Sequence, residues 1–134
     1  MSLDARVGIV LVSHSAALAD GAAELAAQVS GGTVAIIPAG GTDDGRLGTS
    51  AAKVEQALKL ADGGAGVVIV PDLGSAVLTV RALLGEPGDL PTPVEVADAP
   101  FVEGVVAATV AAAGGANITA VLAAAEEARH ARKL

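Results

Sequence analysis

Short runs of branched apolar residues alternate along the chain with longer segments in which apolar residues recur every three or four positions. The short runs predict four β-strands, at residues 7–12, 34–37, 67–70 and 94–96. The first three are apolar at nearly every position, as is typical of strands that helices cover on both faces. We expect Pro38 to end the second strand.

The longer segments predict five helices, one after each strand and a further one at the C-terminal end. Glycines are expected to end the first four, beginning with Gly31 and Gly32. Asn117 is a suitable N-cap for the last helix. Basic residues that suit the negative end of that helix are Arg129, Arg132 and Lys133. The apolar positions at helical spacing are Leu18, Ala22, Leu25 and Val29; Ala51, Val54, Leu58 and Ala61; Val77, Val80 and Leu84; Val102, Val106 and Val110; and Val121, Leu122 and Ala125.

The alternation of strands and helices predicts an α/β fold. We expect a three-layer open sheet, mainly parallel, with helices on both faces and strand order 2-1-3-4. Residues 1–134 are expected to form a single domain, because no repeat or linker divides them. In open sheets of this kind, ligands bind beyond the carboxyl ends of the strands. The segments that follow those ends are residues 13–15, 39–49, 72–75 and 98–100.

His14 follows the first predicted strand directly and precedes the first predicted helix. The free N–H groups and the positive end of a helix favour an anion at such a position. Histidine can also carry a covalent group as a nucleophile. On position alone, a histidine that merely caps the helix or bonds to the neighbouring backbone stays an open alternative.

Asp72 follows the third predicted strand, which lies beside the first in the expected strand order. Its carboxylate is placed to accept the Nδ1–H of His14, which leaves Nε2 free to attack. Alternatively, Asp72 caps the helix that starts near Gly74. Ser75 either offers a hydroxyl to a phosphoryl oxygen or is an ordinary residue of the first helical turn.

The glycine-rich loop before the second helix resembles a phosphate-binding loop only loosely. A Walker A loop needs a lysine before its serine or threonine, and no lysine precedes Thr49, so a nucleotide-binding P-loop is excluded. We expect Gly48, Thr49 and Ser50 to open the second helix, where their N–H groups can receive a phosphoryl oxygen. Asp43 and Asp44 are interpreted as a solvated turn, and no metal site is expected.

Composition and charge exclude several other functions. The chain has no cysteine, which excludes disulfides, thiolate metal sites and a cysteine nucleophile. A formal net charge of -7 and the lack of tryptophan and tyrosine argue against nucleic-acid binding. The longest uncharged runs fall short of a membrane span, and the start of the chain lacks the layout of a signal peptide. We therefore expect a cytoplasmic protein, in which the terminal His130 takes no part in function.

Several segments in combination resemble a known family. They are residues 9–15, 19–21, 24–25, 48–50, 72–76 and 99–104. Together they are similar to the phosphotransferase subunits (DhaM) of phosphoenolpyruvate-dependent dihydroxyacetone kinases, over roughly residues 7 to 115. The parent group is the mannose-type enzyme IIA family, whose members share an α/β fold and a histidine after the first strand.

The resemblance implies a phosphohistidine carrier. His14 is expected to accept a phosphoryl group from the carrier protein HPr. It then passes that group to ADP on the ADP-binding subunit of the kinase, which regenerates the ATP used to phosphorylate dihydroxyacetone. Asp72 matches the aspartate that partners the histidine in the wider family. We expect the phosphoryl group to be bound by Ser13, Ser15, Gly48, Thr49, Gly74 and Ser75.

The resemblance also implies the partners. A separate HPr is expected as the donor, because the chain lacks the HPr-like and enzyme I-like domains fused to some relatives. A homodimer is expected, with an interface that leaves His14 open and uses either the edge of the fourth strand or helices away from the strands' carboxyl ends. No bound cofactor, nucleic acid or membrane partner is expected.

Other functions stay open as alternatives. A mannose-type IIA component of a sugar transporter is the nearest. A tetrapyrrole metal chelatase also places a histidine after the first strand, but it needs a second metal-binding histidine, and His130 is wrongly placed. A Ser-His-Asp hydrolase built from Ser75, His14 and Asp72 lacks the Gly-x-Ser-x-Gly turn. A regulatory domain without enzymatic activity is a further alternative with the same fold.

Overall fold

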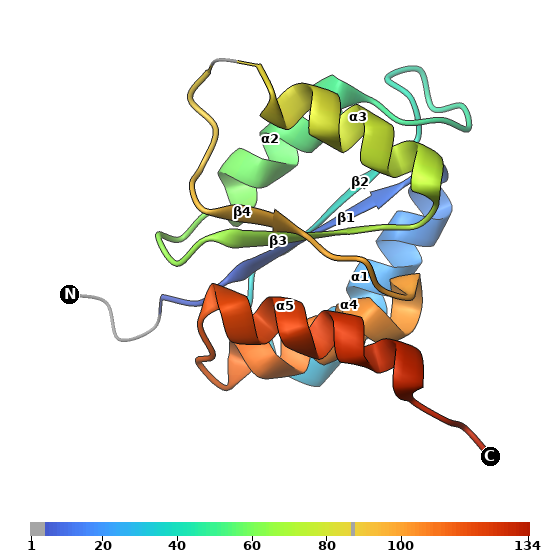
Figure 1. Cartoon of the computed structure of the whole chain (residues 1–134). Coiled ribbons are helices and arrows are strands. Elements are labelled where there is room, and N and C mark those ends of the chain that lie inside the picture. The colour runs from blue at the N-terminus through green and yellow to red at the C-terminus, as the bar shows by residue number, and fades with distance from the viewer. Residues whose placement is uncertain (1–4, 87) are drawn as a thin grey trace.

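The protein folds around a sheet of four parallel strands that helices cover on both faces (Figure 1). The computed structural model describes residues 5–86 and 88–134. The strands are β1 (Gly8–Ser13), β2 (Ile36–Gly40), β3 (Val67–Pro71) and β4 (Val94–Val96). The helices are α1 (Ala16–Ser30), α2 (Ala51–Ala61), α3 (Gly74–Leu84), α4 (Phe101–Ala113) and α5 (Ile118–Glu127), followed by a short 3-10 helix, η1 (Ala128–His130).

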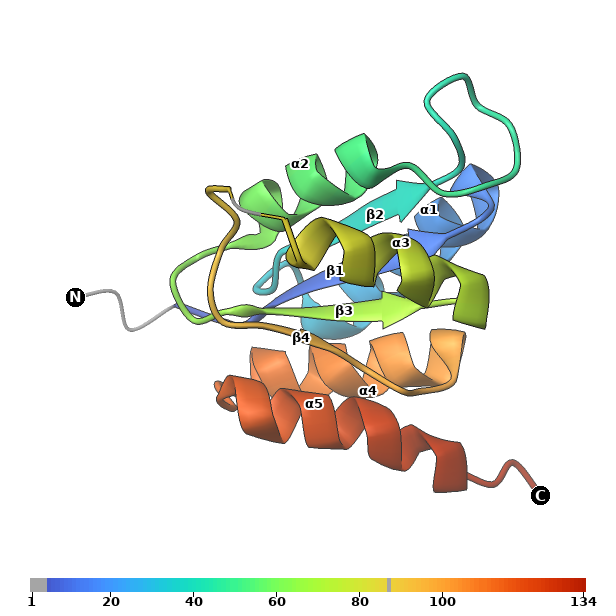
Figure 2. The same ribbon diagram turned by 45° about the horizontal axis from the view of Figure 1, so that its top comes forward.

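The strand order is β2-β1-β3-β4, and each neighbouring pair is parallel. Helices α1, α4 and α5 lie on one face of the sheet, and α2 and α3 lie on the other (Figure 2). The side chains of β1 alternate between the two layers: Ile9 and Leu11 enter the first, and Val10 and Val12 enter the second. The predicted α/β architecture and strand order are confirmed.

Pro38 lies inside β2, so the prediction that it ends this strand is wrong. β2 is an edge strand, and alternate residues make its ladder bonds. The Ile9 N–H donates to the Ala35 carbonyl, and the Gly41 N–H donates to the Ser13 carbonyl. Pro38 lies between two residues that bond to β1, so its own backbone nitrogen faces the open edge of the sheet. A proline there removes no ladder bond.

Alanine, rather than leucine or valine, forms most of the buried face of α1. The larger apolar residues expected at helical spacing, Leu18, Leu25 and Val29, are exposed. Small side chains let α1 pack closely against β2 and α4. On α4, Val102 and Val110 are exposed in the same way. The buried residues of α1 are Ala19, Ala22, Ala23, Ala26 and Ser30.

Two of the residues predicted at the ends of α5, Asn117 and Arg129, lie there as expected. The Asn117 side chain accepts a hydrogen bond from the Ala120 N–H, and Arg129 Nε donates to a carbonyl of the last turn. Lys133 lies beyond the helix and pairs instead with Glu103 of α4, at 3.1 Å.

Among the described residues, no helix is both long and apolar enough to cross a bilayer.

Gly40, the last residue of β2, allows this strand to end against the start of α1. A Cβ at Gly40 would lie 2.5 Å from the Ser15 carbonyl oxygen and 2.8 Å from the Ala16 Cα. We therefore expect Gly40→Ala to lower the free energy of unfolding by about 1–3 kcal/mol. In the control Gly21→Ala, a Cβ meets no atom within 4 Å, and helix propensity favours alanine by about 1 kcal/mol. Urea unfolding that ranks the two variants equally would contradict this expectation.

Candidate active site

His14 and Asp72 lie at the carboxyl ends of two adjacent strands. His14 follows β1 directly, Asp72 follows β3, and the pairing of these strands brings the two residues together. The Asp72 backbone N–H extends the ladder by donating to the Val12 carbonyl at 2.9 Å. The pair therefore occupies the edge of the sheet at which parallel α/β proteins bind ligands.

Asp72 holds His14 through both its ring and its backbone. His14 Nδ1 lies 3.0 Å from Asp72 Oδ1, and the His14 backbone N–H donates to Oδ2 at 3.0 Å. Oδ1 also accepts the N–H of Leu73 at 2.7 Å. The Asp72 side chain is 8% exposed and the His14 side chain 26%. The carboxylate is thus buried behind a ring that a partner can reach.

Ser13 belongs to the buried hydrogen-bond network of Asp72. Its hydroxyl donates to Asp72 Oδ2 at 2.9 Å and accepts the N–H of Ser15 at 3.0 Å. The residue is fully buried. Its hydroxyl therefore has no exposed surface and already has two partners, and the expectation that Ser13 binds the phosphoryl group stays a prediction.

The same network sets the charge of Asp72. Burial by itself raises the pKa of this carboxyl, but hydrogen bonds from the His14 backbone, the His14 ring and the Ser13 hydroxyl outweigh that effect. The pKa of Asp72 consequently lies below its ordinary value of 3.8. The carboxylate can only accept at Nδ1, so the neutral form of the His14 ring carries its proton on Nδ1 and leaves Nε2 unprotonated.

Nε2 of His14 faces the start of α3. The Ser75 hydroxyl lies 2.7 Å from Nε2, and it is the donor because this nitrogen carries no proton. α3 begins at Gly74, with Leu73 as its N-cap and no side-chain cap, so capping is not the role of Asp72. A phosphoryl group on Nε2 would meet a hydroxyl and the positive end of a helix.

The glycine-rich loop contacts the backbone of His14 rather than its ring. The Gly48 N–H donates to the His14 carbonyl at 2.8 Å. The Thr49 hydroxyl lies 2.7 Å from the Thr79 hydroxyl on α3, a contact that the sequence did not predict. The loop thereby links the residue that follows β1 to α3.

Three residues that the sequence predicted to bind the phosphoryl group, Ser15, Gly48 and Thr49, lie just before helices. Ser15 is the N-cap of α1, and its hydroxyl accepts the N–H of Leu18 at 3.2 Å. α2 has Ser50 as its N-cap, so Gly48 and Thr49 precede this helix instead of opening it. The Ser15 and Thr49 hydroxyls and the Gly48 N–H therefore have partners within the protein.

Within the described residues, no group of three or more His, Cys, Asp or Glu side chains is placed to hold a metal ion. Asp43 and Asp44 bond within their own loop, to the hydroxyls of Ser50 and Thr42. His130 lies exposed in η1, at the far end of the chain from β1.

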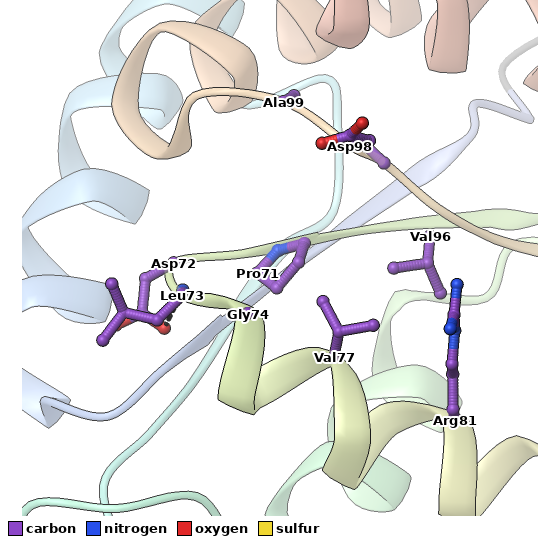
Figure 3. Close-up of a pocket in the computed structure, with 10 residues that line it drawn as sticks. Pro71, Asp72, Leu73, Gly74, Val77, Arg81, Val96, Asp98 and Ala99 are labelled. Carbon is purple, nitrogen blue, oxygen red and sulfur yellow. Dashed lines mark hydrogen bonds between the residues drawn. The ribbon is translucent and has the colours of Figure 1, made fainter.

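A cavity of about 390 Å³ adjoins the site, between α3 and the segment that follows β4 (Figure 3). Pro71, Val77 and Val96 form its apolar part, and Arg81 and Asp98 also line it. The sequence did not predict this cavity, because its lining residues come from separate segments. The one available signal was the spacing of Val77 and Arg81, which places both on one face of α3.

Known proteins resemble this chain in sequence and in fold. Residues 8–122 match the EIIA-man family model, described as the PTS system fructose IIA component. The DhaM phosphoryl donor subunit of the PEP-dependent dihydroxyacetone kinase of Providencia stuartii is 40% identical over 132 residues, which is 95% of this chain. The DhaM subunit of dihydroxyacetone kinase 2 of Listeria innocua is 38% identical over 105 residues, or 78% of this chain. The crystal structure of a protein of unknown function has a TM-score of 0.80 and 34% identity, covering 91% of this chain and 94% of that one.

The length of these relatives differs. The chain spans 28% of the Providencia stuartii subunit but 84% of the Listeria innocua subunit. The family match includes both His14 and Asp72, since it extends from β1 into α5. The chain therefore belongs to the EIIA-man family and, within it, to the DhaM phosphoryl donor subunits of PEP-dependent dihydroxyacetone kinases.

Proposed function

We propose that this protein is a cytoplasmic phosphohistidine carrier that serves a dihydroxyacetone kinase. His14 accepts a phosphoryl group from HPr and passes it to ADP bound on the ADP-binding subunit of the kinase. The observation that carries this proposal is the arrangement of the His14 ring, with Asp72 at Nδ1 and Ser75 at Nε2. The names of the relatives favour a kinase over a sugar transporter as the destination of the phosphoryl group.

The first transfer uses the lone pair of Nε2. Once the Ser75 hydroxyl turns away, Nε2 attacks phosphorus, a new N–P bond forms, and the N–P bond to the histidine of HPr breaks. The His14 ring becomes a cation whose Nδ1–H still points at the Asp72 carboxylate, which stabilises the charge. The Ser75 hydroxyl and the first N–H groups of α3 then donate to the phosphoryl oxygens.

The second transfer restores the starting tautomer. A terminal phosphate oxygen of ADP attacks phosphorus, the N–P bond at Nε2 breaks, and its electron pair returns to the ring. Phosphoryl transfer of this kind needs positioning and charge stabilisation more than further catalytic groups. One histidine, one carboxylate and one helix terminus are therefore sufficient on this chain, and the nucleotide and any cofactor belong to the partner.

Reconstitution from separate proteins tests this function. The protein is incubated with phosphoenolpyruvate and enzyme I, with and without HPr, and its intact mass is measured. We expect one added phosphoryl group per chain that depends on HPr and is removed by the ADP-loaded kinase subunit. No added mass would overturn the proposal. A phosphoryl group that the ADP-loaded subunit leaves in place would indicate a different acceptor, such as a sugar transporter.

We further propose that two copies of the chain form a homodimer away from the site. Leu25 and Val29 lie exposed in the later half of α1, and Val110 lies exposed in the later half of α4, which packs against α1. Both helix halves point away from the carboxyl edge of the sheet (Figure 2). Covering these residues contributes about 25 cal/mol per Å² of apolar surface and leaves His14 open.

Light scattering at micromolar concentration is expected to give about twice the chain mass of 12.9 kDa. Leu25→Ser combined with Val110→Ser is expected to lower the mass toward that of one chain. A wild-type mass of one chain at every concentration and salt would contradict the dimer.

A further inference from the structure

Thr49 and Thr79 share a hydrogen bond between their side-chain hydroxyls, at 2.7 Å. Thr49 lies in the loop before α2, and Thr79 lies in α3, one turn after Ser75. Both threonines are partly buried. The His14 ring bonds to Asp72 and Ser75 instead, so the two threonines are placed to act through other residues.

The threonine pair completes a closed circuit of contacts that starts and ends at His14. The Gly48 N–H donates to the His14 carbonyl at 2.8 Å, and Thr49 is the next residue. The Thr49 hydroxyl bonds to Thr79, which lies four residues after Ser75 on the same face of α3. The Ser75 hydroxyl in turn lies 2.7 Å from Nε2 of His14. The circuit thereby sets the separation between the start of α3 and the reacting nitrogen.

The loop is fixed on both sides of Thr49. Gly48 has a φ of 142°, which favours glycine, and a Cβ there would lie 2.7 Å from Cγ2 of Thr42. Ser50 is the N-cap of α2 and accepts the Lys53 N–H at 3.1 Å. The loop lies at the same end of the sheet as the start of α3 (Figure 2). Thr49 is therefore a fixed point to which α3 can be attached.

The first turn of α3 buries little side-chain surface. Its N-cap, Leu73, makes no side-chain cap bond, Gly74 has no side chain, and Ser75 is exposed. Ala76 is the fully buried residue of this turn. Burial of one methyl group contributes little to the position of a helix end. The hydrogen bond at Thr79 therefore carries more weight here than it would in a well-packed helix.

Phosphorylation of His14 breaks one contact of the circuit and leaves the others. A phosphoryl group on Nε2 takes the place where the Ser75 hydroxyl now lies, so this hydroxyl turns to the phosphoryl oxygens. The bonds at Gly48 and between the two threonines are not affected by that step. They keep the first N–H groups of α3 directed at the phosphoryl group.

We propose that Thr49 and Thr79 are positioning residues for phosphoryl transfer, because their hydrogen bond holds the start of α3 against His14. This proposal rests on the proposed function, since it concerns how the phosphoryl group on His14 is held. Thr49 acts through Thr79 and Ser75, and its own hydroxyl does not contact the phosphoryl group. Donors that are already in place stabilise a transferring group without reorganising during the reaction. A misplacement of about 1 Å can cost about a hundredfold in rate.

The test compares variants that remove or keep each hydroxyl. Thr79→Val and Thr49→Val remove one hydroxyl each at nearly constant shape, a double variant removes both, and Thr79→Ser keeps the hydroxyl. Thr33→Val is the matched control, because it removes a hydroxyl that donates to the Ser30 carbonyl at 3.0 Å, at the opposite end of α1 from His14. Phosphorylation rates are measured with phospho-HPr and with phosphoramidate as a small donor. Circular dichroism establishes that each variant is folded.

We expect Thr79→Val and Thr49→Val to lower the maximal rate with phospho-HPr and the rate with phosphoramidate by the same factor, about tenfold. The KM for phospho-HPr should keep its wild-type value. Thr79→Ser and Thr33→Val should react like the wild type. The double variant should be no slower than the slower single variant, because the two hydroxyls make one bond.

A folded Thr79→Val that reacts at the wild-type rate would overturn the positioning proposal while His14 remained a phosphoryl acceptor. If Thr79→Val does not fold, Thr49→Val applies the same criterion from the loop. A double variant that is severalfold slower than either single variant would also overturn it, since Thr49 would then contact the phosphoryl group itself. So would a loss confined to phospho-HPr, which would assign the threonines to donor binding. If neither donor phosphorylated the wild type, the proposed function would fail, and the positioning proposal with it.

Discussion

Replacing His14 with alanine is expected to abolish phosphorylation of this protein by phosphoenolpyruvate, enzyme I and HPr. The expected loss is complete, because the variant has no ring nitrogen in the site with which phosphorus can form a bond. In the wild type, Asp72 occupies Nδ1 and leaves the lone pair of Nε2 available. Intact mass after incubation should show one phosphoryl group on the wild type and none on His14→Ala.

The second histidine of the chain supplies the matched control. His130 is exposed in η1 and takes part in none of the hydrogen bonds described around His14 and Asp72, so His130→Ala should be phosphorylated like the wild type. The modification should also be lost in acid, as a P–N bond requires, and survive in base. A phosphoryl group that persisted in His14→Ala, or that resisted acid, would refute the assignment of His14.

Much of the fold follows from local patterns that the environment does not override. The apolar runs that form β1 and β3 are buried on both faces, because strands in the middle of a parallel sheet are covered by helices on both sides. The sequence predictions are wrong where contacts with other parts of the chain determine the local structure. Pro38 is tolerated because its nitrogen faces the open edge of β2. The expected strand order places this strand at the edge, but the sequence of residues 34–40 does not reveal which of its residues bond to β1. The leucines of α1 are exposed because close packing against β2 selects alanine, whereas the periodic pattern favours the largest apolar side chains.

Part of the candidate site could likewise be predicted from the sequence, and part could not. The proximity of His14 and Asp72 could be predicted, since it depends only on the strand order and on where two strands end. The role of Ser13 could not, because it depends on which of two neighbouring serines turns inward. The Ser13 side chain is buried against Asp72, while the Ser15 side chain caps α1. Hydrogen bonds between side chains distant in sequence, such as that of Thr49 with Thr79 on α3, cannot be predicted from the periodic pattern of apolar residues.

Asp72→Asn is expected to slow phosphoryl transfer through His14 by about one hundredfold or more, while the protein stays folded. In Ser-His-Asp hydrolases the same change leaves the geometry intact and lowers kcat about 10⁴-fold, because the histidine adopts the wrong tautomer. A reactive phosphoryl donor reduces the dependence on this carboxylate, which is why we expect a smaller loss here. The measurement is the rate at which phospho-HPr adds mass to the variant.

The hydrogen bonds at the two carboxylate oxygens explain the expected loss. Oδ2 accepts the Ser13 hydroxyl and the His14 backbone N–H, and Oδ1 accepts the Leu73 N–H and the ring Nδ1–H. An amide presents an oxygen at only one of these positions. With its oxygen at the Oδ2 position, its nitrogen faces Nδ1 and moves the ring proton to Nε2, where the proton blocks attack. The neutral amide also stabilises the phosphorylated, cationic ring less than a carboxylate does.

Asp62→Asn separates this effect from the simple loss of a negative charge. Asp62 Oδ1 accepts the Gly64 N–H at 3.0 Å at the end of α2, a bond that an amide oxygen retains. We expect this control to transfer phosphoryl groups at the wild-type rate. Circular dichroism and urea unfolding establish that both variants are folded. If Asp72→Asn also transferred at the wild-type rate, the carboxylate would serve only to brace the segments after β1 and β3. The orientation of the His14 ring would then rest on Ser75 alone, which contacts the nitrogen that has to be free for attack.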